Sequence, residues 1–367
     1  MLPMRRLYVA GLLLVVLALP ARSTTAPNAS ELLAEGRAFT TYTALQRYFY
    51  SPATASYNGI YPPAGHAQVW PYSQVLWATL ELARIPGAGS TVLGDLAARI
   101  AGLGAYGNRT RGGIVYDAVY GGKTYVFYDD NAWISLALID ASDLMRSAPF
   151  LVAARQVFRP IESGWDASPR DPCPGGVYWI RSRRNHDRTA VSTANGALIG
   201  ALLYQHTDVR YYLDWARRAY RWSQRCLGTP AGLVSDHING AGAVDTRTWS
   251  YNQGAMIAAG VSLYRATGER RYLLDAERTA NAALAVLTDP LNSGEPASFL
   301  AIFYRDLLQL TTVAPSRNDR AAVESFANAA WARERNARTG LFYFGHTTAT
   351  LLDQAAMVQV YAALAAT

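Results

Sequence analysis

Apolar residues recur at helical spacing along most of the chain, and short stretches rich in glycine and proline separate one periodic segment from the next. Alternating patterns typical of strands are scarce. The pattern therefore predicts an all-α protein with twelve helices. The expected helices cover residues 30–50, 68–85, 88–104, 129–147, 149–159, 192–206, 208–226, 249–267, 269–287, 298–313, 317–335 and 348–366.

The predicted helices are of two kinds. One is apolar almost all round between Trp133 and Ala141, as expected of a helix that has other helices on every side. The helix at 208–226 instead carries an aromatic stripe from Tyr212 to Trp222 and arginines on its other face, which indicates one wet side. Helices of the first, inner kind begin near residues 68, 129, 192, 249, 298 and 348 and alternate with outer ones.

A faint internal repeat links two of these helix pairs. The residues Leu203, Tyr204, Thr207, Arg210, Tyr212, Leu213, Ala216 and Arg218 recur sixty positions later as Leu263, Tyr264, Thr267, Arg270, Tyr272, Leu273, Ala276 and Arg278. A fixed offset of this length is typical of an array of helical hairpins. We predict that six hairpins close into an (α/α)6 toroid. An open solenoid is the alternative, although solenoids usually repeat more regularly and need capping ends.

The first residues have the pattern of a secretory signal peptide. Arg5 and Arg6 precede an apolar run that ends at Leu19, and small residues follow. The run is shorter than the ~20 residues of a spanning helix. We therefore expect residues 1–24 to be a signal peptide, residues 25–367 to form a single (α/α)6 domain, and the mature protein to have no membrane span. An uncleaved anchor is the alternative.

The charge of the chain does not indicate a nucleic-acid partner. The formal net charge is +7, and removing Arg5, Arg6 and Arg22 leaves 7 − 3 = +4. The arginines are not clustered with aromatic residues in the manner of nucleic-acid-binding surfaces. Cys173 and Cys226 are compatible with one disulfide in an exported protein, and we predict that they are bridged. No set of Cys and His has metal-ligand spacing, so we expect no metal and no cofactor.

In a toroid of this kind the N-terminal ends of the six inner helices meet on one face. The segments that lead into these ends are rich in Tyr, Trp, Asn and Gln, at residues 57–61, 115–117, 175–179 and 249–253. Aromatic rings cover the C–H face of a sugar, and amides bind its hydroxyls. These segments therefore predict a carbohydrate site. The alternative is that the rings only wedge between helix ends.

Asp129 and Asp130 begin one of the inner helices, in the run Tyr128-Asp129-Asp130-Asn131-Ala132-Trp133. An ordinary explanation is that one caps the helix and the other complements its dipole. An inner helix would, however, turn both carboxylates toward the centre of the toroid, where neighbouring like charges keep one carboxyl protonated. One carboxylate and one carboxylic acid are what acetal cleavage needs, and neighbouring residues can reach the ~5–5.5 Å separation of retaining glycosidases.

The same run resembles a signature of glycoside hydrolase family 76. A second block, Trp249-Ser250-Tyr251-Asn252-Gln253-Gly254, follows in the family's order, and weaker blocks resemble it at 175–179, 193–196 and 299–303. The resemblance extends over about residues 39–363. It implies an (α/α)6 toroid that cleaves α-1,6-mannosidic linkages inside mannan-type polysaccharide by a retaining mechanism with two aspartates.

The resemblance also implies roles for individual residues. It makes Asp129 the nucleophile, Asp130 the acid/base and Asp236 a further substrate-binding carboxylate, for which an ordinary turn aspartate is the alternative. The other expected substrate-binding residues are Tyr128, Trp133, Trp179, Asn195, Tyr251, Asn252 and Gln253. Ile134 departs from the family, in which an aromatic residue is common after the tryptophan, and this puts one subsite wall in doubt.

The expected partner is a mannan-type polysaccharide or a glycolipid mannan core, with the protein a monomer that is secreted or held in the cell envelope. Fungal members of the family are transglycosylases on wall mannan, so transfer instead of hydrolysis is one alternative. A non-catalytic mannan-binding protein is another, although binding alone does not need a coupled pair of carboxyls. A lyase on the same toroid would want Arg, Tyr and His around an acidic sugar.

Overall fold

The computed structural model describes residues 27–123 and 125–367, and the expected signal peptide, residues 1–24, lies outside them. The helices in the described residues match the twelve predicted ones to within a few residues at each end. They are α1 (Ala29–Phe49), α2 (Val69–Arg84), α3 (Gly89–Gly102), α4 (Tyr128–Leu144), α5 (Ala148–Ser163), α6 (Ala190–Thr207), α7 (Arg210–Leu227), α8 (Ser250–Thr267), α9 (Arg270–Val286), α10 (Ala297–Thr311), α11 (Arg317–Arg333) and α12 (Leu351–Ala366).

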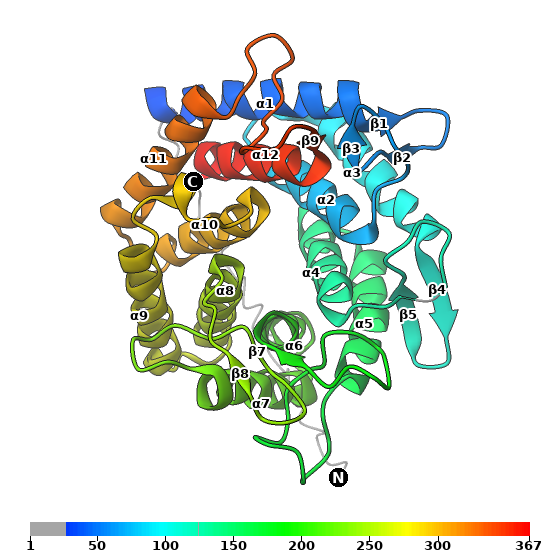
Figure 1. The fold of residues 1–367 in the computed structure, drawn as a ribbon, viewed down its shortest axis with the longest axis vertical. Helices are drawn as coiled ribbons and strands as arrows, with labels where there is room; N and C mark the ends of the chain where they lie inside the picture. The colour runs from blue at the N-terminus through cyan, green and yellow to red at the C-terminus, as the bar shows by residue number, and fades with distance from the viewer. Residues whose placement is uncertain (1–26, 124) are drawn as a thin grey trace, which may run out of the picture.

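The helices form two concentric rings (Figure 1). The inner ring consists of the even-numbered helices α2 to α12, each packed against the next, and α12 packs against α2 to close it. Five outer helices each follow the inner helix that they cover, whereas α1 packs on α12. The sixth helix pair is therefore made by segments from the two ends of the fold. This arrangement is the predicted (α/α)6 toroid.

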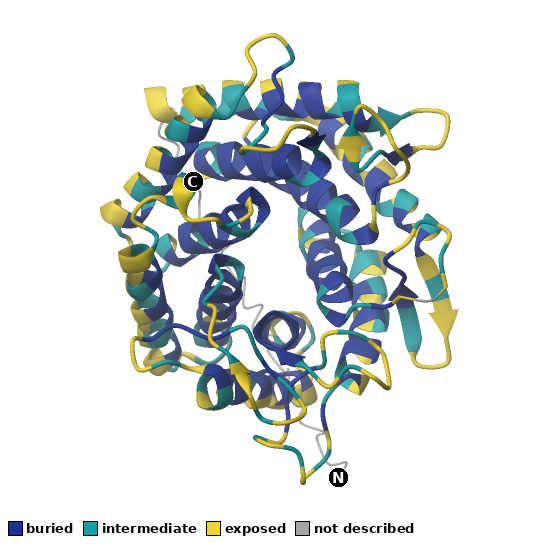
Figure 2. Cartoon of the chain, in the orientation of Figure 1, coloured by how far each residue is buried: buried dark blue, intermediate teal, exposed yellow. Residues whose placement is uncertain are grey.

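The two kinds of helix predicted from the hydrophobic pattern occupy the two rings (Figure 2). α4 and α8 are buried almost all round, because other helices surround them. α7 buries the stripe that contains Tyr212, Trp215 and Trp222 and exposes its arginine face. Although the inner helices are apolar, none of the helices in the described parts of the chain is both long and apolar enough to cross a membrane.

Glycines explain part of the sixty-residue repeat. A Cβ atom on Gly200 of α6 would lie 2.8 Å from the carbonyl oxygen of Tyr212, and one on Gly260 of α8 would lie 2.9 Å from that of Tyr272. Real side chains do not tolerate contacts this close. The two glycines, sixty positions apart like the tyrosines, therefore let an inner helix approach its outer partner closely, which gives the repeat a packing origin.

Short strands lie in the segments that connect the helices. They are β1 (Tyr50–Ser51), β2 (Ser56–Tyr57), β3 (Ile60–Tyr61), β4 (Gly107–Thr110), β5 (Gly113–Tyr116), β6 (Arg188–Thr189), β7 (His237–Ile238), β8 (Val244–Asp245) and β9 (Ala349–Thr350). All pairings are antiparallel, in the orders β1-β2, β3-β9, β4-β5 and β6-β7-β8. The segments of β3, β6 and β9 lead toward the N-terminal ends of inner helices, so these small sheets fix the loops on that face.

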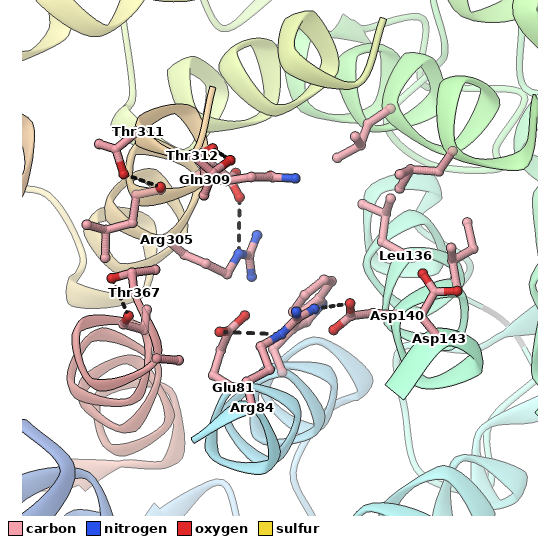
Figure 3. Close-up of a pocket in the computed structure, with 18 of the residues that line it drawn as sticks. Glu81, Arg84, Leu136, Asp140, Asp143, Arg305, Gln309, Thr311, Thr312 and Thr367 are labelled. Carbon is pink, nitrogen blue, oxygen red and sulfur yellow. Dashed lines mark hydrogen bonds and ion pairs between the residues drawn. The ribbon is translucent and has the colours of Figure 1, made fainter. Parts of the chain in front are cut away.

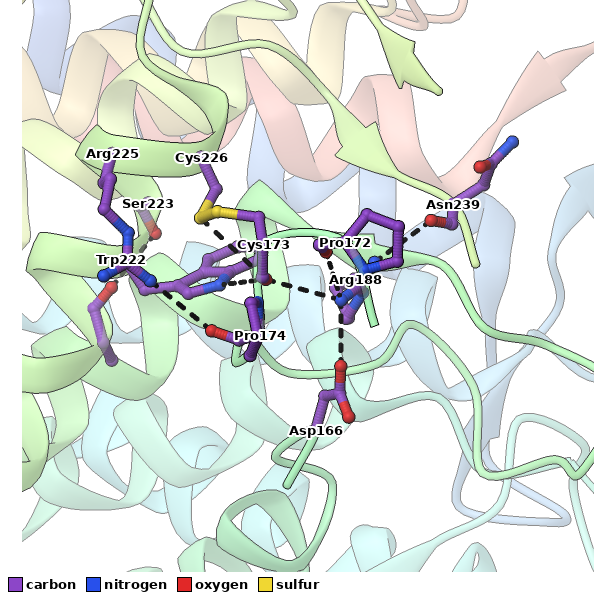
Figure 4. The surroundings of a disulfide bond; sticks show 11 residues. Asp166, Pro172, Cys173, Pro174, Arg188, Trp222, Ser223, Arg225, Cys226 and Asn239 are labelled. Atoms are coloured by element: carbon purple, nitrogen blue, oxygen red, sulfur yellow. Dashed lines mark hydrogen bonds and ion pairs between the residues drawn. A yellow bond between two sulfur atoms is a disulfide. The ribbon is translucent and has the colours of Figure 1, made fainter. Parts of the chain in front are cut away.

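The predicted disulfide between Cys173 and Cys226 is present, with a Cα–Cα distance of 6.1 Å (Figure 4). It ties the long loop between α5 and α6 to the end of α7. The buried Arg188 holds the same loop from inside, because its guanidinium donates to Oδ2 of Asp166 at 2.8 Å and to the carbonyl oxygen of Asn239 at 3.0 Å. The loop is therefore anchored at both ends where it passes the N-terminal end of α6.

Candidate active site

The aspartate pair lies in the first turn of α4, but neither aspartate caps this helix. The N-cap residue is Phe127, which makes no side-chain capping hydrogen bond. Asn131 holds the start of the helix instead: its Oδ1 accepts from the amide of Tyr116 at 2.8 Å, and its Nδ2 donates to the carbonyl oxygen of Phe127 at 2.8 Å. Capping therefore does not account for Asp129 and Asp130.

Burial changes the proton affinity of both aspartates. It raises the pKa of Asp129 to about 7, while amide N–H groups at the helix start and the Trp179 side chain oppose the rise and Asp236 adds to it. Burial raises the pKa of Asp130 well above its usual range, and the neighbouring charge of Asp129 raises it further. Near neutral pH, therefore, Asp129 begins to lose its proton while Asp130 still keeps its own.

Asp236 is brought to the start of α8 by hydrogen bonds from that helix. Asn252 donates from Nδ2 to Oδ1 of Asp236 at 3.1 Å, and Nδ1 of His237 lies 2.9 Å from its Oδ2. Gln253 clamps the same segment, since its Oε1 accepts from the amide of Val234 at 2.9 Å and its Nε2 donates to the Val234 carbonyl at 2.8 Å. The first turn of α8 therefore positions a carboxylate next to the site.

Tyr251 belongs to an aromatic cluster centred on Phe299. Its ring stacks on Phe299 of α10, with ring centroids 3.9 Å apart and planes 15° apart. Trp249 and Trp70 pack on the same phenylalanine at 5.7 and 5.9 Å. Burial raises the pKa of Tyr251, and the charges of Asp236 and Asp129 raise it further, which places this tyrosine within electrostatic reach of both carboxyls. Four elements of the fold therefore converge here.

Trp179 lies on the solvent side of the pair. Its indole is 42% exposed and rests against Phe127 at a centroid distance of 5.1 Å. Its carbonyl oxygen accepts from the amide of Tyr128 at 2.8 Å. A hydrogen bond from its side chain lowers the pKa of Asp129. An exposed indole held beside a carboxyl is a suitable platform for the C–H face of a sugar ring.

Three further residues of the predicted site lie below the surface. Trp133 is 1% exposed, and its carbonyl oxygen accepts from Nε1 of Trp77 at 3.2 Å. Tyr128 packs so closely on Gly164 that a Cβ there would lie 2.7 Å from its ring. Asn195 is fully buried, and neither atom of its amide has a hydrogen-bond partner in the described part of the chain. The first two support the start of α4 from beneath.

This arrangement also includes residues that are not among the predicted site residues, namely Trp70, Trp249, Phe299 and His237. Phe299 has a positional signal, because it is the third residue of α10, as Asp130 is of α4 and Asn252 is of α8. Trp70 is the second residue of α2, as Asp129 is of α4 and Tyr251 is of α8. His237 directly follows Asp236 in the sequence, but no pattern in the sequence marks its ring as a partner of that carboxylate.

Asp236, His237 and Asp245 lie close enough together to bind a metal ion, with their ligand atoms within 4.8 Å of one another. Each group already has a partner, however. Arg247 binds both carboxylate oxygens of Asp245 from Nε, at 3.0 and 3.1 Å, and Asn252 binds Asp236. We therefore interpret the cluster as a hydrogen-bonded network that orients Asp236.

Comparisons with known proteins identify the family and the fold. The model of glycosyl hydrolase family 76 matches residues 34–367. The mannan endo-1,6-alpha-mannosidase DCW1 of Saccharomyces cerevisiae is 31% identical over 155 residues, which cover 38% of this chain and 34% of the yeast protein. The putative mannan endo-1,6-alpha-mannosidase C970.02 of Schizosaccharomyces pombe is 28% identical over 171 residues, 42% of this chain and 37% of that protein. The matched segments thus span about a third of the length of these curated relatives.

Solved structures show the same fold. A family 76 glycoside hydrolase (mannosidase) from Bacteroides thetaiotaomicron superposes with a TM-score of 0.82 at 24% identity, covering 91% of this chain and 98% of that one. An inactive variant of the α-1,6-mannanase of Salegentibacter sp. HEL1_6, with two consecutive aspartates changed to asparagine and α-1,6-mannotriose bound, has a TM-score of 0.76 at 21% identity, covering 90% and 99%. On the strength of the family match over nearly its whole length, the chain belongs to glycosyl hydrolase family 76.

Proposed function

We propose that the protein is an endo-acting α-1,6-mannosidase that hydrolyses mannan-type polysaccharide with retention of configuration. The observation that carries the proposal is the pair of consecutive carboxyls at the start of α4, whose burial gives them unequal proton affinities. Membership of the family supports it, as do the names of the yeast relatives. The mannanase that binds mannotriose after loss of two consecutive aspartates offers a parallel.

In the first step, the Asp129 carboxylate attacks the anomeric carbon and Asp130 gives its proton to the departing glycosidic oxygen. The carbon–oxygen bond to the leaving sugar breaks, and a glycosyl ester forms on Asp129. In the second step, Asp130 takes a proton from water, and the water oxygen attacks the same carbon and releases Asp129. The proton affinity of Asp130, raised above that of Asp129, suits the acid role.

The surrounding residues suit a chain of sugar rings. Trp179 offers an exposed aromatic face beside the pair, and the Tyr251–Phe299 stack forms a wall on the other side. Asp236, oriented by Asn252 and His237, is a hydrogen-bond acceptor for sugar hydroxyls. We assign substrate binding to Trp179, Tyr251, Asp236 and Asn252. Among the buried members of the set, Tyr128, Trp133 and Gln253 then hold these groups in place, whereas Asn195, whose amide atoms have no partner among the described residues, keeps its expected role in substrate binding.

We further propose that the protein acts outside the cytoplasm, on a polysaccharide or on a glycolipid mannan core, as a monomer. The charged, apolar and small-residue order of the first 24 residues supports export. The bridge between Cys173 and Cys226 supports an oxidising compartment. Mass spectrometry of the culture medium and the envelope fraction would locate the mature protein, and a mature N-terminus that still includes Leu19 would contradict cleavage.

The decisive experiment is incubation of the mature protein with linear α-1,6-mannan and chromatography of the products. Short oligomers of several lengths should appear early, and Asp129→Asn and Asp130→Asn should each remove the activity. Asp353→Asn is the matched control, because Asp353 lies in the first turn of another inner helix but is engaged by Thr350 in a helix cap. Cleavage of uronate polymers without cleavage of mannan would instead indicate a lyase, and longer products would indicate transfer.

A further inference from the structure

A cavity lies at the end of the inner ring opposite the aspartate pair (Figure 3). It has a volume of about 540 Å³, within the range of sites for small organic ligands. Its walls are the C-terminal halves of the inner helices. Asp140 is ten residues beyond Asp130 along α4, which corresponds to roughly 15 Å at the helical rise. We call this space the rear cavity.

A floor of stacked side chains separates the rear cavity from the aspartate pair. Trp77 donates its Nε1 hydrogen to the carbonyl oxygen of Trp133, the last residue of the run that contains the aspartate pair. The Arg305 guanidinium lies over the Trp77 ring at 4.1 Å and 5.9 Å from the Trp133 ring. The rear cavity is therefore a separate compartment behind the catalytic helix.

Charged side chains enter this compartment in pairs. Arg84 is bonded to Asp140 and lies 3.7 Å from the carboxylate of Glu81, and Nε of Arg305 lies 3.1 Å from Oδ1 of Asp306. In Figure 3, Glu81 and Arg84 from α2 and Arg305 from α10 point into the same space. Oδ2 of Asp140, Oδ2 of Asp306 and Nε of Arg84 are buried and have no hydrogen-bond partner among the described residues.

Unpartnered polar atoms of this kind are costly to bury unless something binds them. Oδ2 of Asp306 lies against the buried Gly254 of α8, where a Cβ would be 3.1 Å from it, so this atom belongs to the packing between α8 and α10. One acceptor, on Asp140, and one donor, on Arg84, remain available, in a cavity whose wall on α4 and α6 is apolar, with Leu136, Leu198 and Leu202. Hydroxyl groups both donate and accept, so they can satisfy both atoms.

The charges of the lining argue against a charged ligand. Four acids line the cavity against three arginines, and burial raises the pKa of Glu81 and of Asp306 and so favours their neutral forms. The net charge of the lining is 3 − 4 = −1 with all acids ionised and 3 − 2 = +1 with these two neutral, so it is small in either state. A phosphate or a polyamine would gain only a weak field here, whereas a neutral ligand with several hydroxyls incurs no penalty for burying a charge.

We propose that the rear cavity is a binding site for a small, neutral, polyhydroxylated molecule of the size of a mono- or disaccharide. Its hydroxyls bind the free atoms of Arg84 and Asp140, and its C–H face lies on the leucines of α4 and α6. The site is distinct from the catalytic one, and its occupation does not depend on the proposed reaction.

Cysteine protection tests this site directly. Ala366 is half-buried and lines the cavity, and Cys173 and Cys226 are bridged, so Ala366→Cys supplies the single free thiol of the chain. Mannose should slow the reaction of this thiol with a maleimide, about tenfold at ten times its Kd. Ala337→Cys is the matched control on an exposed turn, and its labelling rate should not change.

Two further arms identify the site and its chemistry. Leu202→Trp fills the apolar wall, and in the Ala366→Cys background it should abolish the protection by mannose while activity on mannan is kept. Mannose 6-phosphate should protect much less than mannose, because the lining carries at most one unit of net positive charge and cannot compensate the burial of a phosphate. The proposal is overturned if mannose does not slow the labelling of Ala366→Cys, if Leu202→Trp leaves the protection intact, or if the phosphate protects equally well.

Discussion

Asn252 and Asp236 join two parts of the chain that secondary structure alone does not connect. Nδ2 of Asn252, in the first turn of the inner helix α8, donates to Oδ1 of Asp236 at 3.1 Å. Asp236 directly precedes the strand β7. Since Asp236 also raises the proton affinity of Asp129, this hydrogen bond places a carboxylate from a loop within reach of the aspartate pair.

We expect Asn252→Ala to weaken substrate binding more than the chemical step. Loss of the amide leaves Oδ1 of Asp236 unpartnered and the carboxylate free to turn, which costs about 1–3 kcal/mol, or roughly 5- to 150-fold in kcat/KM. Steady-state kinetics on α-1,6-mannooligosaccharides would measure it, with most of the change in KM. Asn292→Ala is the control, since Asn292 makes a similar bond to Asp289 on the exposed surface. Unchanged kinetics for Asn252→Ala would remove Asp236 from the substrate site.

The two aspartates should respond differently to truncation. Asp130→Ala should still cleave a mannosyl fluoride, because this leaving group needs no proton, and should then accumulate the glycosyl ester on Asp129. Added azide attacks that ester and should give a mannosyl azide of retained configuration, which NMR identifies. Asp129→Ala should turn over neither the fluoride nor mannan. Rescue of Asp129→Ala by azide with inversion, without rescue of Asp130→Ala, would reverse the roles.

The pH profile of kcat/KM should follow the two raised pKa values. Because Asp129 attacks as a carboxylate and its pKa is about 7, the rate should rise with pH up to a midpoint near 7. It should fall again at higher pH, where Asp130 loses the proton that it must donate. The Trp179 side chain lowers the pKa of Asp129, so Trp179→Phe should move the acidic midpoint upward while keeping an aromatic face. An acidic midpoint near 4 in the wild-type protein would mean that Asp129 is not held in this environment.

Much of the fold follows from the sequence, because helical periodicity is a local property. The alternation of all-round apolar and one-sided helices predicts the two rings, and the pair Asp129–Asp130 stands out by its position at the start of an inner helix. The pairing of α1 with α12 has no local signal, because it joins segments some 300 residues apart. The same holds for the rear cavity, because its charged residues come from the C-terminal halves of helices that are far apart in the sequence.

Burial of Asp129 should carry a measurable cost in stability. Its pKa in the folded protein is about 7, above the ordinary value of 3.8, so the folded state binds this proton more tightly than the unfolded state. The contribution of this group to the free energy of unfolding is therefore greatest below about pH 4, falls as the pH rises to about 7 and stays constant above it. Asparagine cannot ionise, so Asp129→Asn should match the wild type at pH 4 and be more stable at pH 8.

Urea denaturation at the two pH values would measure this difference. A gain of roughly 1–4 kcal/mol at pH 8 is expected, the upper end corresponding to a full three-unit shift and the lower end to a half-buried group. Asp245→Asn is the contrasting control: Arg247 lowers the pKa of Asp245 to about 2, so its removal should bring no gain at pH 8. Equal stability of Asp129→Asn and wild type at both pH values would show that the carboxyl is as well solvated in the folded enzyme as in water. The prediction of an acidic midpoint near pH 7 for kcat/KM would then also be wrong.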